Sequence, residues 1–159
     1  MTILEMLAQD HDSLRALLLK TDEATAGAGP SIDLAVVFHD IKARLLAHTR
    51  AEEDTFYAAL QAIDATEEHA DHAVDEHEAI EAVLALLDTI EVGSATWHAG
   101  FHRLREALLQ HIAAEEDGLF AAARAVLDEP TQRRLAHAFH AERQRLLDDG
   151  AAVVVRKSA

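Results

Sequence analysis

The stretch LLAHTRAEEDTFYAAL at residues 45–60 returns as LLQHIAAEEDGLFAAA at residues 108–123. Each copy has a leucine pair, a histidine, a glutamate four residues later and then an apolar run. Successive residues of a helix are about 100° apart, so residues four apart lie on one face. In the first copy this face carries Leu45, His48, Glu52 and Phe56; in the second it carries Leu108, His111, Glu115 and Leu119. The pattern predicts two His–Glu pairs on core-facing helix surfaces, where an unpaired carboxylate is costly.

The duplication extends well beyond these two stretches. Residues 38–59, FHDIKARLLAHTRAEEDTFYAA, align with residues 101–122, FHRLREALLQHIAAEEDGLFAA. The segments before them also correspond, because DHDSLRALLL around His11 resembles EHEAIEAVLAL around His77. The repeated unit reads as a helical hairpin, and two such hairpins predict a bundle with internal pseudo-two-fold symmetry.

Composition and periodicity predict an all-α fold. The 159 residues are 50% hydrophobic, with 2 Pro and 6 Gly, and apolar residues recur at spacings of three and four. We expect helices over about 3–25, 32–61, 65–91, 95–127 and 131–148, separated at AGAGPS (26–31), near 61–65, at VGS (92–94) and at DEP (128–130). Short connections between long helices favour an antiparallel up-down four-helix bundle, a duplicated helical hairpin, with a short fifth helix against one end or side. Residues 1–150 are expected to form one domain, and residues 151–159 a frayed tail.

Three helix ends carry local signals. Thr2 followed by Glu5 has the capping-box pattern that starts a helix, and Asp64 followed by Glu67 has the same pattern for the third helix. Gly150 is expected to end the last helix as a C-cap.

The charge balance excludes several classes of partner. A formal net charge of −15 disfavours nucleic acid and anionic membranes, since both are bound through Lys and Arg.

The absence of Cys excludes disulfides and thiolate zinc sites. The N-terminus lacks a secretory signal pattern and no apolar run approaches the ~20 residues that span a bilayer, so we expect a soluble, cytoplasmic protein.

The histidines are the unusual feature, with 11 in the chain. Counted from residue 29 in the first loop, His11 lies 18 residues before it and His48 lies 19 after it. Counted from residue 94 in the later loop, His77 and His111 each lie 17 residues away. Positions equidistant from the turn of an antiparallel hairpin lie at one height. The spacing therefore predicts one histidine from each of four helices in a single layer, with Glu52 and Glu115 one turn along.

Such a layer has the chemistry of a metal site. Imidazole and carboxylate ligands suit iron, zinc, copper or manganese, and six of them exceed what one tetrahedral zinc uses. Two ions, each with two histidines and joined by both glutamates, fit the set, and iron is the best candidate. The Glu-x-x-His pairs of ferritin-like sites and the His-Glu-x-x-His pattern of zinc proteases are both absent.

Over roughly residues 3–125 the chain resembles the hemerythrin-like family, the HHE cation-binding domain. The motifs are His11, His48-x-x-x-Glu52, His77 and His111-x-x-x-Glu115, in this order. The resemblance implies an antiparallel four-helix bundle around two non-haem iron ions. It also implies that His11 and His48 hold one iron, that His77 and His111 hold the other, and that Glu52, Glu115 and an oxo or hydroxo group bridge them.

One position departs from the family pattern. Hemerythrins proper carry a fifth histidine one turn before the third-helix histidine, and that position is Ala73 here. His72 is an alternative ligand, and His69 is a second alternative ranked after it. Glu116 is the alternative to Glu115. The vacated position favours a site that reacts with or senses small oxidants over simple oxygen carriage.

His39 and His102 are expected to face outward or toward a helix boundary, in surface or capping roles. His98, His137 and His140 are expected on the surface or in the packing of the fifth helix.

The function expected from these residues and the resemblance is binding of, or reaction with, a small oxidant: oxygen, peroxide or nitric oxide. Oxidative or nitrosative stress defence and catalase-like peroxide decomposition follow from the same expectation, with no catalytic residue beyond the metal ligands. A reductase or signalling partner is left open. The alternative is oxygen or iron sensing, or iron handling, without turnover.

Overall fold

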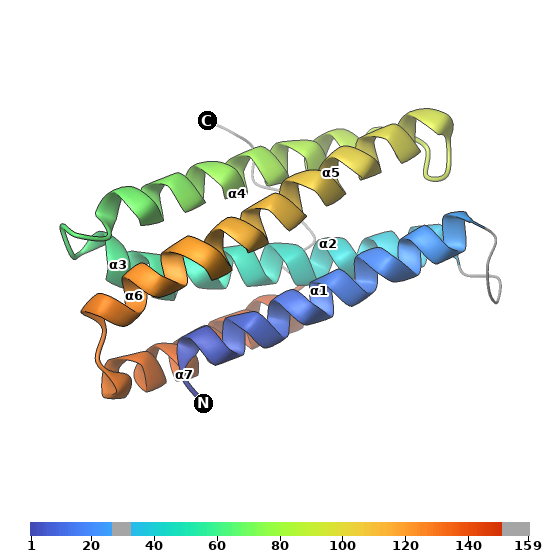
Figure 1. Cartoon of the computed structure of the whole chain (residues 1–159). Helices are drawn as coiled ribbons and strands as arrows, with labels where there is room; N and C mark the ends of the chain where they lie inside the picture. The colour runs from blue at the N-terminus through green and yellow to red at the C-terminus, as the bar shows by residue number, and fades with distance from the viewer. Residues whose placement is uncertain (27–32, 151–159) are drawn as a thin grey trace.

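The computed structural model describes residues 1–26 and 33–150, and these residues form helices and turns with no strand. Figure 1 shows long helices running side by side along one axis. The elements are α1 (Ile3–Thr25), α2 (Leu34–Ala51), η1 (Glu52–Tyr57), α3 (Ala58–Gln61), α4 (Glu67–Leu87), α5 (Ala95–Ala114), η2 (Glu115–Leu119), α6 (Phe120–Val126) and α7 (Glu129–Asp148).

Two antiparallel hairpins build the bundle, as the repeat predicts. The first pairs α1 with α2, η1 and α3, which run on as one helix, and the second pairs α4 with α5, η2 and α6 (Figure 1). The all-α, four-helix-bundle prediction is confirmed. The first loop, within AGAGPS, lies mostly outside the described residues, as does the tail from residue 151.

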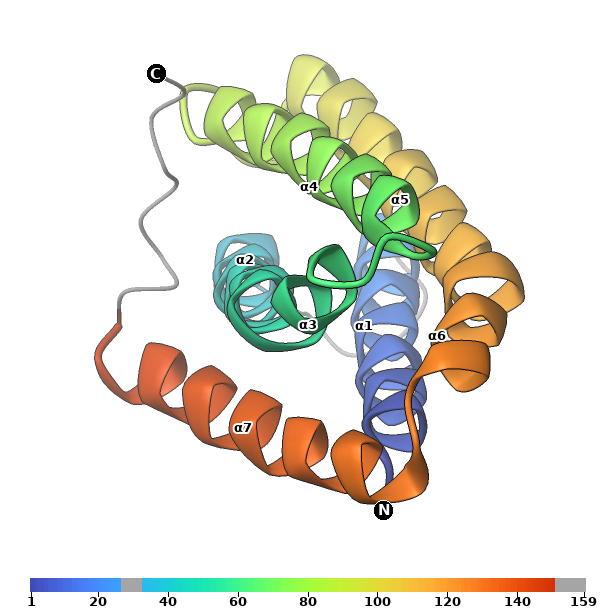
Figure 2. The ribbon, with the colours of Figure 1, turned by 90° about the vertical axis from the view of Figure 1, so that its left-hand side faces the viewer.

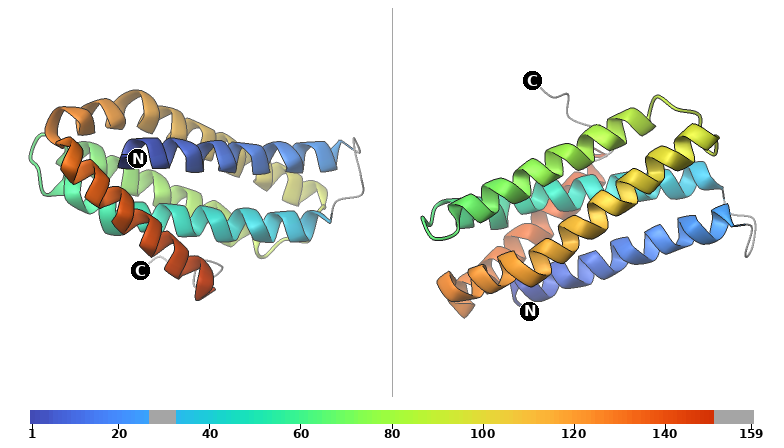
Figure 3. Two further views of the ribbon diagram at one scale, coloured as in Figure 1. Left: turned by 90° about the horizontal axis from the view of Figure 1, so that it is seen from below. Right: turned by 45° about the horizontal axis from the view of Figure 1, so that its top comes forward.

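The fifth helix, α7, lies across the side of the first hairpin. It packs against both α1 and α2, and Figures 2 and 3 show it crossing them obliquely. The turn before it is well capped, since the Asp128 carboxylate accepts a hydrogen bond from the Thr131 N–H at 2.8 Å and a proline occupies the first turn. Gly150, with φ of +64°, closes the C-terminal end as the sequence predicts.

The sequence did not predict that each long repeat helix contains a π-helical segment. Both segments begin at the first glutamate of a Glu-Glu-Asp motif, at Glu52 in η1 and at Glu115 in η2. A π turn is wider than an α turn and occurs most often at functional sites. A π segment occurs at the same point of both copies of the repeat. The helices therefore depart from regular α-helical geometry at the Glu-Glu-Asp motif.

The start of α4 differs from the sequence prediction. Thr2 and Glu5 form the expected capping box at α1, but the box predicted at Asp64 is wrong, because α4 begins at Glu67 after a tight turn. The Thr66 hydroxyl donates instead to the carbonyl oxygens of Leu60 and Ile63, at 2.8 and 3.2 Å. The helix also ends at Leu87 rather than near residue 91.

Apolar side chains fill the bundle on both sides of the polar layer. At the far end from α7, the buried Trp97 ring stacks on Phe101 and meets Phe38 edge-on, with ring centres 5.1 and 5.4 Å apart. The layer that holds His11, His48, His77 and His111 lies nearer the other end. In residues 1–26 and 33–150, no helix is long and apolar enough to cross a membrane.

The turn before α5 gives a stability prediction. Gly93 has φ of +84°, a conformation that costs an L side chain about 1 to 2 kcal/mol. We expect Gly93→Ala to lower the free energy of unfolding by about that amount in denaturant titrations. Gly118→Ala is the control, since Gly118 is helical and open space surrounds it, so it should stabilise by about 0.5 to 1 kcal/mol. Equal effects at the two positions would contradict the account.

Candidate metal centre

The four predicted histidines come together at one level of the bundle. His11, His48, His77 and His111 belong to α1, α2, α4 and α5, and each is at most 1% exposed. The ring nitrogens Nε2 of His77 and His111 lie 3.0 Å apart. The rings of His11 and His48 meet edge-on, with centres 5.1 Å apart. The layer predicted from loop distances is therefore present, arranged as two histidine pairs.

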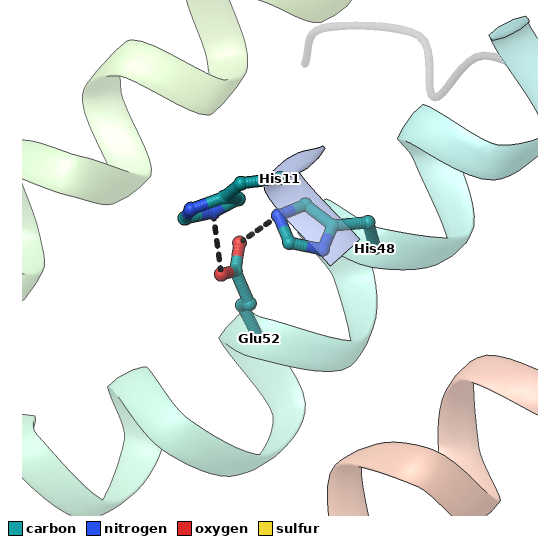
Figure 4. Close-up of side chains that lie close together, drawn as sticks. All are labelled: His11, His48 and Glu52. Atoms are coloured by element: carbon teal, nitrogen blue, oxygen red, sulfur yellow. Dashed lines mark ion pairs between the residues drawn. The ribbon is translucent and has the colours of Figure 1, made fainter. Parts of the chain in front are cut away.

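Glu52 lies between the two pairs. Its Oε2 is 3.2 Å from His48 Nε2 and 3.4 Å from His77 Nε2, and its Oε1 is 4.0 Å from His11 Nε2. Figure 4 shows the carboxylate directed at His11 and His48. Nitrogen and oxygen atoms of His11, His48 and Glu52, and again of Glu52, His77 and His111, lie within 4.8 Å of one another. One carboxylate thus serves both pairs.

Glu115 is the second buried carboxylate, on the opposite hairpin. Its Oε2 lies 3.2 Å from His11 Nε2 and 3.8 Å from His111 Nε2. It too reaches one histidine of each pair, as the pseudo-symmetry of the repeat requires. Each of the two glutamates therefore lies near histidines of both pairs.

A further carboxylate contacts the outer ring nitrogen, Nδ1, of each imidazole. The four contacts join the Nδ1 atoms to side-chain oxygens: His11 to Glu116 at 2.9 Å, His48 to Asp10 at 3.3 Å, His77 to Glu53 at 3.0 Å and His111 to Glu76 at 2.7 Å. Sequence reasoning missed this set. A signal was present, since each of these acids directly neighbours one of the six predicted ligands: Asp10 and Glu76 precede histidines, and Glu53 and Glu116 follow glutamates.

These contacts fix the tautomer of each ring. An ionised carboxylate only accepts hydrogen bonds, so each Nδ1 carries the proton and donates it. In the neutral form of each ring, the Nε2 atom then carries the lone pair, and it faces the centre. Carboxylate–histidine pairs of this kind orient metal-ligating imidazoles and raise their basicity.

Arginines hold two of the outer carboxylates in place. Arg15 binds both oxygens of Glu116, with nitrogen–oxygen distances of 3.1 and 2.8 Å. Arg143 of α7 lies 3.3 Å from Asp10 Oδ2, the atom that contacts His48. The fifth helix therefore reaches the centre through an Arg143–Asp10–His48 chain. The Phe139 ring of α7 also packs edge-on against His48, with centres 5.9 Å apart.

Burial keeps two of the imidazoles neutral. It lowers the pKa of His48 to about 4, and it also lowers the pKa of His77. Burial acts in the same direction on His11, but contacts with Glu115 and Glu116 outweigh it and raise the pKa of that ring. Neutral imidazole is the form that binds metals.

The two central carboxylates have opposite pKa shifts. Burial, followed by the charge of Glu115, raises the pKa of Glu52 well above its usual value. Burial also acts to raise the pKa of Glu115, but contact with His11 and the charges of His111 and His11 lower it to about 2. Two carboxylates this close disfavour each other's ionised form. Cations placed between them would stabilise both.

Tyr57 is a further residue that the sequence did not single out. Its buried hydroxyl donates to Glu115 Oε1 at 3.0 Å and lies 3.4 Å from His77 Nε2. Burial and the neighbouring carboxylates raise its pKa, so the phenol keeps its proton. Tyr57 places a hydrogen-bond donor beside the centre. The sequence had suggested no acid or base there apart from the predicted ligands.

The donor set fits metal ions better than it fits a satisfied polar core. Five buried atoms facing the centre make no hydrogen bond of acceptable geometry within the described residues: His11 Nε2, His48 Nε2, both oxygens of Glu52 and Glu115 Oε2. Leaving that many buried polar atoms unpaired is costly. Neutral imidazole nitrogens and carboxylate oxygens suit divalent transition metals.

The alternative ligands lie elsewhere. His72 is 74% exposed, with Nε2 3.5 Å from Glu76 Oε1, and His69 is exposed on the same helix. Glu116 points at the outer nitrogen of His11 rather than into the centre. His39 and His102 are exposed, as expected.

Comparison with known proteins agrees with this arrangement. The family model for the hemerythrin HHE cation binding domain matches residues 2–123. The fold resembles the crystal structure of a hemerythrin HHE cation binding domain-containing protein from Mycobacterium kansasii, with a TM-score of 0.81 and 19% identity over 96% of this chain and 97% of that one. A search of curated protein sequences returned no match.

The outer carboxylates give a prediction about metal affinity. Glu76→Gln keeps the shape of the acceptor behind His111 but removes its charge, so we expect metal affinity to fall about 10- to 100-fold. Glu78→Gln, an exposed site two residues away, is the matched control and should bind as the parent does. Competition with a chromogenic chelator measures both. Equal affinities would show that the His111–Glu76 contact does not support the centre.

Proposed function

The chain belongs to the hemerythrin HHE cation-binding domain family, and from this premise we propose that it holds two iron ions and reacts with a small oxidant. His11 and His48 would hold one ion, His77 and His111 the other, with Glu52 and Glu115 shared between them. Peroxide is the favoured oxidant, with oxygen and nitric oxide as alternatives, and defence against oxidative or nitrosative stress is the physiological role that we propose.

The observation that carries the proposal is the convergence of unsatisfied ligand atoms. Four imidazoles from four helices present Nε2 inward while a carboxylate fixes each Nδ1, and two buried glutamates lie between them. An arrangement with two histidines per ion and two shared carboxylates leaves coordination positions for an exogenous ligand. Ala73 stands where hemerythrins proper carry a fifth histidine, and this replacement leaves a further coordination position for such a ligand.

A reduced iron pair would supply two electrons, which with two protons break the O–O bond of one hydrogen peroxide and give two water molecules. Oxidation of a second hydrogen peroxide to oxygen would return the two electrons and the two protons. The protein's part is to hold and orient the groups at the centre. Tyr57, which donates to Glu115, holds its proton beside the centre. The apolar core on both sides of the layer lowers the local dielectric, which strengthens these interactions.

Loss of one ligand should abolish the chemistry. We expect iron-loaded His111→Ala to consume hydrogen peroxide at no more than about a hundredth of the parent rate, since the ion it holds would be lost. His102→Ala, on the opposite, exposed face of the same helix, is the control and should retain the parent rate. An oxygen electrode or the loss of ultraviolet absorbance of peroxide measures the rates. Parent-like consumption by His111→Ala would refute peroxide chemistry at this centre.

A second function, sensing without turnover, is supported by one feature of the structure. The helix α7 touches the centre through Phe139 against His48 and Arg143 against Asp10. A change in the occupancy of the His11–His48 pair would therefore change the packing under α7. A signalling partner that binds α7 would read the state of the metal.

Hydrogen exchange tests the sensing alternative. Removing the metal should leave the central carboxylates and imidazoles without cations, loosen the layer and raise amide exchange in residues 136–146 of α7. The start of α5 around Trp97, at the other end of the bundle, provides the internal comparison and should change little. Identical exchange of α7 with and without metal would eliminate this alternative.

A further inference from the structure

A pocket of about 360 Å³ lies between α4 and η2. Two of the residues that line it, His111 and Glu115, belong to the proposed ligand set. Both are at most 2% exposed, so a small part of each side chain borders the pocket.

The other three imidazoles are covered by aromatic rings. Phe120 stacks on His11 at 6.1 Å between ring centres, and Phe139 closes over His48 at 5.9 Å. The Tyr57 ring lies 5.2 Å from His77. His111 lies at the pocket wall instead. The pocket thus borders the centre on the side of the ion that His77 and His111 would hold.

Small residues give the pocket its width. Ala73, Ala114 and Gly118 all line it. Glycine in a helix costs about 1 kcal/mol relative to alanine, and Gly118 needs neither a positive φ nor close packing, since an added Cβ would meet nothing within 4 Å. The lack of a side chain at Gly118 leaves space in the pocket for a bound molecule.

The size and charge of the pocket indicate the ligand. A water molecule takes up about 30 Å³, so the pocket has room for far more than oxygen or hydrogen peroxide. Within the described residues, no lysine or arginine lines it, and Glu68 and Glu76 do. An anion would be repelled at this wall, whereas an uncharged molecule with an apolar part would pack against the alanines and Leu119.

We propose that this pocket binds the organic group of an uncharged organic hydroperoxide, with the peroxide end directed toward His111 and Glu115. The proposal rests on the peroxide chemistry proposed above and names a substrate class for it. It also places the approach of the substrate on the α4–η2 side of the bundle, away from α7.

Binding is tested with 2-phenyl-2-propanol, the alcohol that corresponds to cumene hydroperoxide and that the centre cannot reduce. Saturation-transfer NMR on the protein as purified should show the phenyl protons in contact with the parent protein. Gly118→Leu fills the pocket and should remove the signal. Ala121→Leu enlarges an exposed residue of α6 outside the pocket and should retain it. Circular dichroism checks folding, and Ala114→Leu replaces Gly118→Leu if the latter does not fold.

Single-turnover rates of protein loaded anaerobically with ferrous iron give the second readout, because that iron supplies the two electrons that convert a hydroperoxide to its alcohol and water. We expect Gly118→Leu to lower the ratio of cumene hydroperoxide to hydrogen peroxide consumption about tenfold or more, because the larger substrate loses its space. No contact of the alcohol with the parent protein, or a signal and a rate ratio that Gly118→Leu and Ala114→Leu leave unchanged, would overturn the proposal. If hydrogen peroxide is also inert, the function proposed above fails, but the alcohol experiment still decides the pocket.

Discussion

The burial of two carboxylates among four imidazoles is the constraint on which the rest of the structure depends. Glu52 and Glu115 lie in the middle of a helical bundle, where an unpaired charge costs several kcal/mol. The pKa of Glu52 is raised and that of Glu115 is lowered, in keeping with the mutual repulsion of two buried carboxylates. Cations at the centre would satisfy both carboxylates and the inward-facing nitrogens together, and would cross-link the four helices.

The duplicated hairpin supplies this layer from two copies of one set of residues. Each repeat contributes two histidines, one central glutamate and two outer carboxylates, and the outer ones lie next to the ligands in sequence. Asp10 and Glu76 serve the histidine of the other helix in their own hairpin, whereas Glu53 and Glu116 serve a histidine of the opposite hairpin. The symmetry is broken on the outside, where α7 covers the first hairpin and the pocket opens on the second.

The sequence was sufficient to predict the bundle, the fifth helix and the meeting of six side chains, because helical periodicity and loop distance determine which residues share a face and a height. It did not reveal the π segments at Glu52 and Glu115, since their hydrogen bonds differ from α-helical ones by one residue with no residue type to mark them. The capping prediction at Asp64 failed because that pattern is local, whereas the Thr66 hydroxyl donates to the carbonyl oxygen of Leu60 in α3 and to that of Ile63 in the turn. Tyr57 was missed because regular α-helical geometry places it about 180° from His48, away from the face of the predicted ligands. The π segment from Glu52 to Tyr57 departs from that geometry.

Metal content of protein purified without added metal, together with its ultraviolet-visible spectrum, decides whether the four histidines and two glutamates hold a pair of iron ions. We expect about two irons per chain and oxo-to-iron charge-transfer bands in the near ultraviolet, since the six proposed ligands divide into two sets with shared carboxylates. A single zinc per chain, or no metal after anaerobic loading with ferrous iron, would contradict this expectation.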